Sequence, residues 1–279
     1  LKKVWVCRRA SDQTAAAMTA GAGNLVLASL LPLSLLATSP TTTPQPLGDD
    51  EVEVYFGAGC FWHVQAELNE AEEDVLGRSG ASITGITGYA GGFDNSGEVC
   101  YTNYGKKGHT EVVQLRLPRR HVAAIATFVW QDLFSRGERT DTANRGAPYR
   151  SAIGLPGGAA GDPRLLEAID AAQGTREVKL VPGSGDDGDN LGTRSIYVYD
   201  SNKFPFHQAE LYHQFHDYKG SYRKDLLAAG RLRETSCPSE TMAMLSHPVV
   251  LVLLSIIGAG MFCCCFGVAY KRLKTIWKQ

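Results

Sequence analysis

The residue of this chain best placed for nucleophilic chemistry is Cys60. It directly follows a glycine-containing turn at residues 57–59, and the alternating residues 52–56 before that turn predict a half-buried strand. After the cysteine, apolar residues recur at helical spacing and predict an amphipathic helix over residues 61–75. The N–H groups of a first helical turn have no intrahelical acceptors, and together with the helix dipole they stabilise a thiolate. Cys60 therefore has the position of an acidic, nucleophilic cysteine, with a small buried hydrophobe as the alternative.

A candidate acid lies at the start of another predicted strand. Apolar and polar side chains alternate in residues 109–117, with Val113, Leu115 and Leu117 on one face. Glu111 has the same parity as this apolar set, so we expect its carboxyl group on the core side of the sheet. Burial raises the pKa of a carboxyl group, and a carboxyl group that keeps its proton near neutral pH can act as a general acid. The alternative is an exposed glutamate at the end of a strand.

Five segments within residues 52–238 resemble, in order, motifs of the A-type peptide methionine sulfoxide reductases. The segments are Gly59-Cys60-Phe61-Trp62, residues 88–92 (GYAGG), residues 108–113 (GHTEVV), residues 146–151 (GAPYRS) and residues 209–214 (AELYHQ). One such motif alone would say little, whereas five in the same order indicate this family.

The resemblance implies a role for most of the candidate residues. Cys60 would attack the sulfur of methionine S-sulfoxide, free or within a protein, as a repair of oxidative damage. Phe61 and Trp62 would form the apolar wall that holds the substrate methyl group, with packing at the helix start as the alternative. Glu111, Tyr89 and Tyr149 would bind the sulfoxide oxygen, and Glu111 would protonate it; a phenol suits this task because it donates a hydrogen bond from a rigid apolar body.

The resemblance also implies how the enzyme would be regenerated. Attack leaves methionine and a sulfenic acid on Cys60, which a second thiol converts into a disulfide. Thioredoxin or another external dithiol then reopens this disulfide, and no bound cofactor is needed. The second thiol is expected to be Cys237, which resembles the resolving cysteines near the C-terminus of family members, and Cys100 is its competitor.

Besides the open choice of the second thiol, the sequence departs from the family pattern at two positions. His63 stands where glycine usually follows the Phe-Trp pair. Asn144 stands where the family usually has an aspartate of the substrate-binding hydrogen-bond network. The loss of this carboxylate leaves open a weakened enzyme that serves as a thiol redox sensor or binding module.

Metal-binding and hydrolase patterns are weak. Cysteines at Cys-x-x-Cys spacing are absent from the sequence, which argues against a zinc site, and the acidic residues 183–189 lack the ligand spacing of a calcium loop. A cysteine hydrolase that uses Cys60 and His109 is conceivable, but no orienting third residue or oxyanion motif accompanies the pair. We therefore expect no metal.

Strands and helices alternate irregularly along the chain, which favours an α+β fold with helices packed on an antiparallel or mixed sheet. The resemblance implies a ferredoxin-like two-layer sandwich with extended loops. Beyond the segments named above, we expect strands at residues 83–89, 149–155, 177–181 and 194–200, and helices at residues 121–134, 163–173 and 206–218.

Both ends of the chain differ from its middle. Residues 1–39 have a basic start and a short apolar run and predict a signal or targeting leader, followed by a linker at 40–50 and the reductase domain at 51–238. After a juxtamembrane linker at 239–247, the uncharged residues 248–270 would extend about 34 Å as a helix and predict a transmembrane span.

The basic tail at 271–279 would be cytosolic by the positive-inside rule, which places the domain on the luminal or extracellular side, with an organelle membrane also possible. The net charge of −1 gives no sign of nucleic-acid binding.

Overall fold

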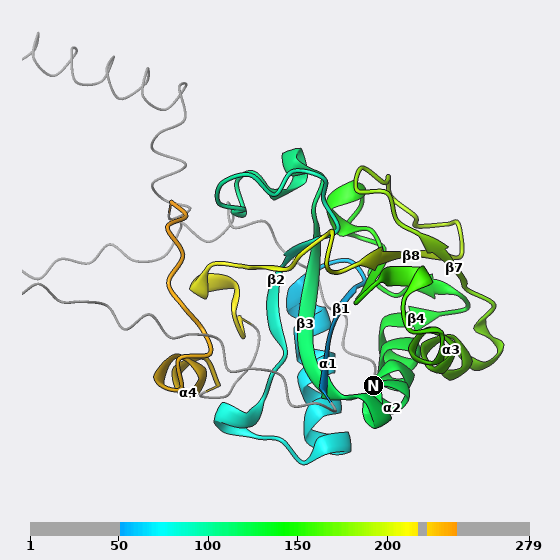
Figure 1. The fold of residues 1–279 in the computed structure, drawn as a ribbon, viewed down its shortest axis with the longest axis horizontal. Coiled ribbons are helices and arrows are strands. Elements are labelled where there is room, and N and C mark those ends of the chain that lie inside the picture. Colours follow the sequence, from blue (N-terminus) through cyan, green and yellow to red (C-terminus); the bar gives the residue numbers. More distant parts are fainter. Residues whose placement is uncertain (1–50, 217–221, 239–279) are drawn as a thin grey trace, which may run out of the picture.

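The computed structural model describes residues 51–216 and 222–238, which are built around a mixed seven-stranded sheet (Figure 1). The strand order is β7-β8-β6-β1-β3-β2-β9. The strands are β1 (Glu51–Gly57), β2 (Ile86–Ala90), β3 (Thr110–Pro118), β6 (Ala152–Leu155), β7 (Lys179–Pro182), β8 (Ser195–Asp200) and β9 (His207–Gln208). A separate two-stranded ribbon contains β4 (Phe134–Ser135) and β5 (Glu138–Arg139). The helices are α1 (Phe61–Leu76), α2 (Val122–Phe128), α3 (Pro163–Ala172) and α4 (Tyr222–Ala228).

The centre of the sheet has a split β-α-β topology. β3 lies between β1 and β2 and is antiparallel to both, and α1 connects the two outer strands of this trio. β6 is antiparallel to β1 on its other side, while β8 and β7 extend the sheet in parallel pairs. This is the topology expected at the centre of a ferredoxin-like sandwich, so the prediction of a mixed sheet with packed helices is confirmed.

The predicted alternation of β1 and β3 explains how the core is divided. Val54 and Phe56 belong to the large core cluster, together with Val113 and Leu115 of β3. Tyr55 points to the opposite face and belongs to a smaller buried cluster. The register pairs Phe56 with Val113, which aligns the apolar positions of the two strands on one face. The site-bearing ends of both strands are therefore fixed by packing on two sides.

The predicted helix at 206–218 is wrong for the part of that range that the structure describes. This part contains β9 and a 3-10 turn at Leu211–His213. The side chain of Gln214 accepts from the N–H of Thr87 at 3.0 Å and donates to its carbonyl at 2.9 Å, which joins the segment to β2. Long-range pairing has replaced the local helical pattern.

Three other predicted elements have different bounds. β2 begins only at Ile86, because the Glu72 carboxylate accepts from the N–H groups of Thr84 and Gly85 before it. The strand predicted at 149–155 begins at Ala152, after a 3-10 turn at Ala147–Tyr149. The helix predicted at 121–134 continues beyond α2 as a π-helical turn at Val129–Leu133.

Among residues 51–216 and 222–238, no helix is long and apolar enough to cross a membrane. The predicted leader at 1–39, the linker at 40–50, the juxtamembrane segment, the span at 248–270 and the basic tail lie outside the described residues.

Candidate active site

Cys60 is the N-cap residue of α1, as the sequence predicts. Its side chain is only 3% exposed, and Gly59 before it has φ +88°, a conformation that favours glycine. The Cys60 N–H donates to Oδ2 of Asp141 at 2.8 Å, and the Phe61 N–H donates to Oε2 of Glu111 at 2.9 Å. The expectation that the N–H groups of this turn lack acceptors is therefore wrong for Cys60 and Phe61, because each donates to a carboxyl group. Cys60 is itself disulfide-bonded in this structure, so the arrangement is that of an oxidised chain.

Glu111 is buried on the core side of β3, as its parity predicts. It is 1% exposed, and its Oε1 accepts from the hydroxyl of Tyr104 at 3.0 Å. Burial raises the pKa of Glu111 to about 8, and the nearby charge of Asp141 acts in the same direction. The hydrogen bonds from Phe61 N–H and Tyr104 oppose this shift. Glu111 therefore carries a proton at neutral pH, directly beside the Cys60 turn.

The phenol that contacts Glu111 comes from Tyr104, which the sequence reasoning missed. Tyr104 begins a 3-10 turn at Tyr104–Lys107, and its N–H donates to the Cys100 carbonyl at 2.8 Å. Tyr89 pairs with Glu111 across β2 and β3, but its hydroxyl donates to Glu210 at 2.8 Å. The Tyr89 and Tyr104 rings stack with centroids 4.6 Å apart. A tyrosine at the start of a short 3-10 turn gives no periodic pattern from which this contact could be predicted.

Tyr149, the other predicted oxygen-binding phenol, lies in the 3-10 turn before β6. It is partly buried. Burial raises the pKa of Tyr104 most, the nearby Glu111 comes next, and Tyr149 adds a smaller effect in the same direction. Burial likewise raises the pKa of Tyr89 well above its ordinary value. Tyr89 and Tyr104 are therefore neutral hydrogen-bond donors throughout the physiological pH range.

Phe61 and Trp62 belong to an aromatic cluster, as expected for an apolar wall. The ring centroid of Phe61 lies 5.9 Å from that of Tyr89 and 5.3 Å from that of His213. Trp62 stacks on His216 with centroids 3.8 Å apart. Phe61 is almost fully buried, whereas Trp62 is partly exposed, so Trp62 offers the more accessible part of this wall. The cluster combines rings from α1, β2 and the segment after β9.

The amide of Asn144 contacts a carboxylate that the sequence reasoning did not identify. Its Nδ2 donates to Oδ2 of Asp141 at 2.8 Å, the same oxygen that accepts from Cys60 N–H. Oδ1 of Asp141 accepts from the N–H groups of Ala143 and Asn144 at 3.2 and 3.1 Å. A carboxylate is therefore present at the Cys60 turn although residue 144 itself is an amide.

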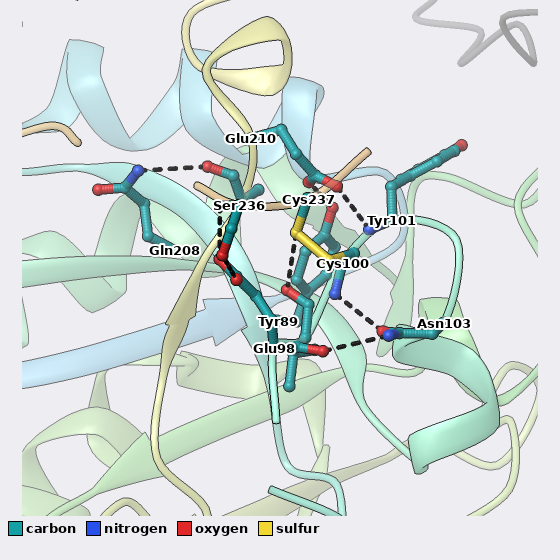
Figure 2. The surroundings of a disulfide bond; sticks show 11 residues. Tyr89, Glu98, Cys100, Tyr101, Asn103, Gln208, Glu210, Ser236 and Cys237 are labelled. Atoms are coloured by element: carbon teal, nitrogen blue, oxygen red, sulfur yellow. Dashed lines mark hydrogen bonds between the residues drawn. A yellow bond between two sulfur atoms is a disulfide. The ribbon is translucent and has the colours of Figure 1, made fainter. Parts of the chain in front are cut away.

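The two candidate resolving cysteines are bonded to each other. Cys100 and Cys237 form a disulfide with their Cα atoms 5.6 Å apart. Figure 2 shows Glu210 beside this bond, where its carboxylate accepts from the N–H of Tyr101 at 2.8 Å and from the Tyr89 hydroxyl. Donor atoms of Cys100, Cys237 and Glu210 lie within 4.8 Å of one another, but the sulfurs are bonded to each other, so the arrangement is that of a redox pair.

His109 is not arranged as a base for Cys60. Its Nδ1 accepts from the N–H of Gly92 at 3.2 Å, and its Nε2 lies 3.0 Å from the carbonyl oxygen of Asp94. Burial lowers the pKa of His109 to about 4, so its ring is neutral and supports the turn after β2. This geometry disfavours the Cys60–His109 hydrolase.

Comparison with known proteins agrees with the motif assignment. Residues 52–157 match the family model described as Peptide methionine sulfoxide reductase, and this region includes Cys60, Tyr89 and Glu111. A search of curated proteins gives no match.

Two solved structures are among those that match parts of this chain. Methionine sulfoxide reductase A of Corynebacterium diphtheriae is 19% identical, with 62% of this chain and 76% of that chain covered and a TM-score of 0.38. Mxr1 from Saccharomyces cerevisiae in reduced form is 16% identical, with 61% and 87% covered and a TM-score of 0.39. The family-model match over residues 52–157, which contain the nucleophile and the buried acid, supports an enzyme of the peptide methionine sulfoxide reductase type.

Proposed function

We propose that the chain reduces the S epimer of methionine sulfoxide, free or in oxidised proteins, with Cys60 as the nucleophile. The observation that carries this proposal is the pairing of Cys60, at the start of α1, with the buried Glu111, which accepts from the next backbone N–H. A soft sulfur nucleophile and a protonated acid beside it are the two groups that the reduction of a sulfoxide requires.

The reaction begins once Cys60 is reduced. Its thiolate attacks the sulfoxide sulfur, and Glu111 gives its proton to the oxygen of the breaking S–O bond. Transfer of that oxygen to the Cys60 sulfur releases methionine and leaves a sulfenic acid on Cys60. Tyr104 holds the Glu111 carboxyl group in place. Tyr149, and Tyr89 once its hydroxyl is released from Glu210, are the phenols that bind the sulfoxide oxygen.

The aromatic cluster binds the substrate methyl group. Phe61 forms the buried side of this pocket and Trp62 the accessible side, and Asn144 supports the loop that faces Cys60. An apolar, aromatic wall favours a methyl thioether over a polar group, because burial of the methyl group is favourable and burial of an unpaired polar group is not.

The Cys100–Cys237 disulfide supports a relay of three thiols. Cys237 attacks the sulfenic acid of Cys60, which releases water and forms a Cys60–Cys237 disulfide. Cys100 then attacks Cys237, which returns Cys60 to the thiol and forms the disulfide of Figure 2. Thioredoxin or another dithiol reduces this second disulfide by exchange and becomes oxidised itself. No metal or bound cofactor takes part.

The proposed function is tested by single-turnover reduction of the separated epimers. The full chain, reduced beforehand, is expected to convert the S epimer to methionine and to leave the R epimer unchanged, and Cys60→Ser is expected to abolish conversion. A thiol sensor would form an oxidised Cys60 without releasing methionine. Absence of methionine from both epimers with a folded, reduced chain would rule out the reductase function.

We expect Cys100→Ser and Cys237→Ser to separate the first turnover from the following ones. Each variant should release about one methionine per chain and then stop, because Cys60 still reacts but the relay is incomplete. Peptide mapping should find a Cys60–Cys237 disulfide in Cys100→Ser. Continued turnover of both variants with a thioredoxin-like reductant, at the rate of the unmodified chain, would contradict the relay.

A further inference from the structure

We propose that Asp141 is a positioning residue, which fixes the backbone of Cys60 and places a carboxylate at the same helix start that Glu111 contacts through the Phe61 N–H. This inference rests on the proposed function for its catalytic meaning. It concerns a residue that lies outside the motifs at residues 59–62, 88–92, 108–113, 146–151 and 209–214.

Asp141 contacts the Cys60 turn closely. Its Oδ2 accepts from the Cys60 N–H at 2.8 Å, and a Cβ atom added at Gly59 would lie 2.4 Å from the same oxygen. Gly59 therefore has two reasons to be glycine, its φ of +88° and the approach of this carboxylate. A side chain in such contact with the N-cap residue sets the position from which the Cys60 sulfur projects.

The loop that carries Asp141 is held by a buried arginine. Arg139 is 2% exposed, and its Nη1 lies 2.9 Å from Oδ1 of Asp189. The same guanidinium donates to the carbonyl oxygens of Asp141 and Asn144 at 3.0 and 2.8 Å. Oδ2 of Asp189 also accepts from the Gly146 N–H at 2.7 Å, so the ion pair between the buried Arg139 and the partly exposed Asp189 fixes both ends of the loop.

Asn144 gives the carboxylate a charge-neutral partner. Its amide donates to Oδ2 of Asp141, and the backbone N–H groups of Ala143 and Asn144 satisfy Oδ1. All of these partners are hydrogen-bond donors without a formal charge. The Arg139 guanidinium contacts the backbone carbonyl of Asp141 and not its carboxylate, whose hydrogen-bond donors among the described residues are uncharged, so the carboxylate can act on its surroundings.

The groups around Glu111 determine what this charge does. Glu111 is contacted by the Phe61 N–H and the Tyr104 hydroxyl, and both bonds favour its ionised form. Burial opposes ionisation and is the larger effect, and Asp141 is the charged residue that adds to it. Other ionisable groups nearby are the phenols of Tyr89, Tyr101 and Tyr149 and the carboxylate of Glu210, which raise the pKa of Tyr104 or of Tyr89. Removal of the Asp141 charge should therefore lower the pKa of Glu111.

A titration of Glu111 in the full, reduced chain tests this role independently of activity. The ¹³C NMR shift of the Glu111 carboxyl carbon, assigned by its loss in Glu111→Gln, reports the pH at which it ionises. In Asp141→Asn, whose amide oxygen can still accept from Cys60 N–H, we expect the midpoint to fall by roughly half to one pH unit. The alkaline decrease of the single-turnover rate should shift by the same amount.

Two further variants separate charge from structure. Asp141→Asn combined with Asn144→Asp exchanges the carboxylate and the amide of this hydrogen-bonded pair and so restores the negative charge. The midpoint of the Glu111 titration should then move back towards its original value. Asp74→Asn is the control. It changes an exposed carboxylate on α1, the helix that begins after Cys60, at about 20 Å from Cys60, and it should leave the titration of Glu111 unchanged.

The outcomes distinguish this inference from the proposed function. An unshifted Glu111 midpoint in Asp141→Asn overturns the role of Asp141, whatever the activity. A shifted midpoint that the charge-restoring double variant does not reverse also overturns it, because the loss would then be structural. If the midpoint shifts and reverses while the unmodified chain releases no methionine, the electrostatic role stands and the proposed reaction fails.

Discussion

Glu111→Gln is expected to lower the single-turnover rate of methionine formation by ~10²–10⁴-fold at pH 7, the usual contribution of a general acid. Glutamine retains an acceptor oxygen for the Phe61 N–H but has no proton to give to the sulfoxide oxygen. In the unmodified chain the acid form of Glu111 exists below a pKa of about 8 and is lost above it. The rate should therefore decrease as the pH rises through about 8, and this decrease should be absent from the variant.

The measurement is stopped-flow or quenched-flow formation of methionine between pH 6 and pH 9.5. Glu70→Gln, which changes an exposed glutamate on α1, is the matched control and should retain both the rate and the pH profile. An unaltered alkaline limb in Glu111→Gln would show that another group controls it and would remove Glu111 from the role of acid.

Arg150→Met is expected to reduce the free energy of unfolding by about 3–5 kcal/mol. The Arg150 side chain is fully buried and donates to Gly91, Gly108 and Ala147 carbonyl oxygens at 2.8, 2.8 and 2.9 Å. It also donates to the Tyr199 hydroxyl at 2.7 Å. Methionine fills much of the side-chain volume but leaves these buried carbonyl oxygens without a donor. The segments that contain Gly91, Gly108 and Ala147 would then no longer be joined through residue 150.

Urea denaturation of the two chains measures this difference. Arg164→Met, at an exposed position of α3, is the control and should change the free energy of unfolding by no more than ~0.5 kcal/mol. If Arg150→Met and Arg164→Met changed the free energy of unfolding by a similar amount, the hydrogen bonds of the buried Arg150 would not be what holds these segments together. Since Arg150 lies next to the motif residue Tyr149, this result would also weaken the assignment of that segment to the site.

The part of the site that could be predicted from the sequence is the part that local periodicity determines. The helical spacing after Cys60 correctly predicts its N-cap position, because the buried face of α1 fixes where that helix begins. The strand parity of Glu111 correctly predicts its burial, because a side-chain period of two leaves only one face for it.

Residues placed by long-range contacts could not be predicted in the same way. Asp141 lies in a loop and Tyr104 at the start of a short 3-10 turn, neither of which has a periodic pattern. Their positions depend on Arg139 and on the Cys100 turn. The segment after residue 206 has local helical features, but its hydrogen bonds go to Thr87 of β2. In this segment a distant strand edge outweighs local propensity.

The pairing of Cys100 with Cys237 is another long-range feature. Sequence reasoning treated the two residues as competitors for one role, because their spacing of 137 residues carries no information about contact. The fold places their segments side by side next to Glu210, as Figure 2 shows. A relay that uses both thiols follows from this contact and not from either motif.

The most direct test of the central claim uses a chain in which Cys60 is the single remaining cysteine. After reduction and one addition of methionine S-sulfoxide, a sulfenic-acid-specific probe such as dimedone is added and the chain is analysed by mass spectrometry. We expect one methionine released per chain and one probe molecule on Cys60, because no second thiol can resolve the intermediate. Release of methionine without labelling of Cys60, or labelling without release of methionine, would contradict transfer of the sulfoxide oxygen to this cysteine.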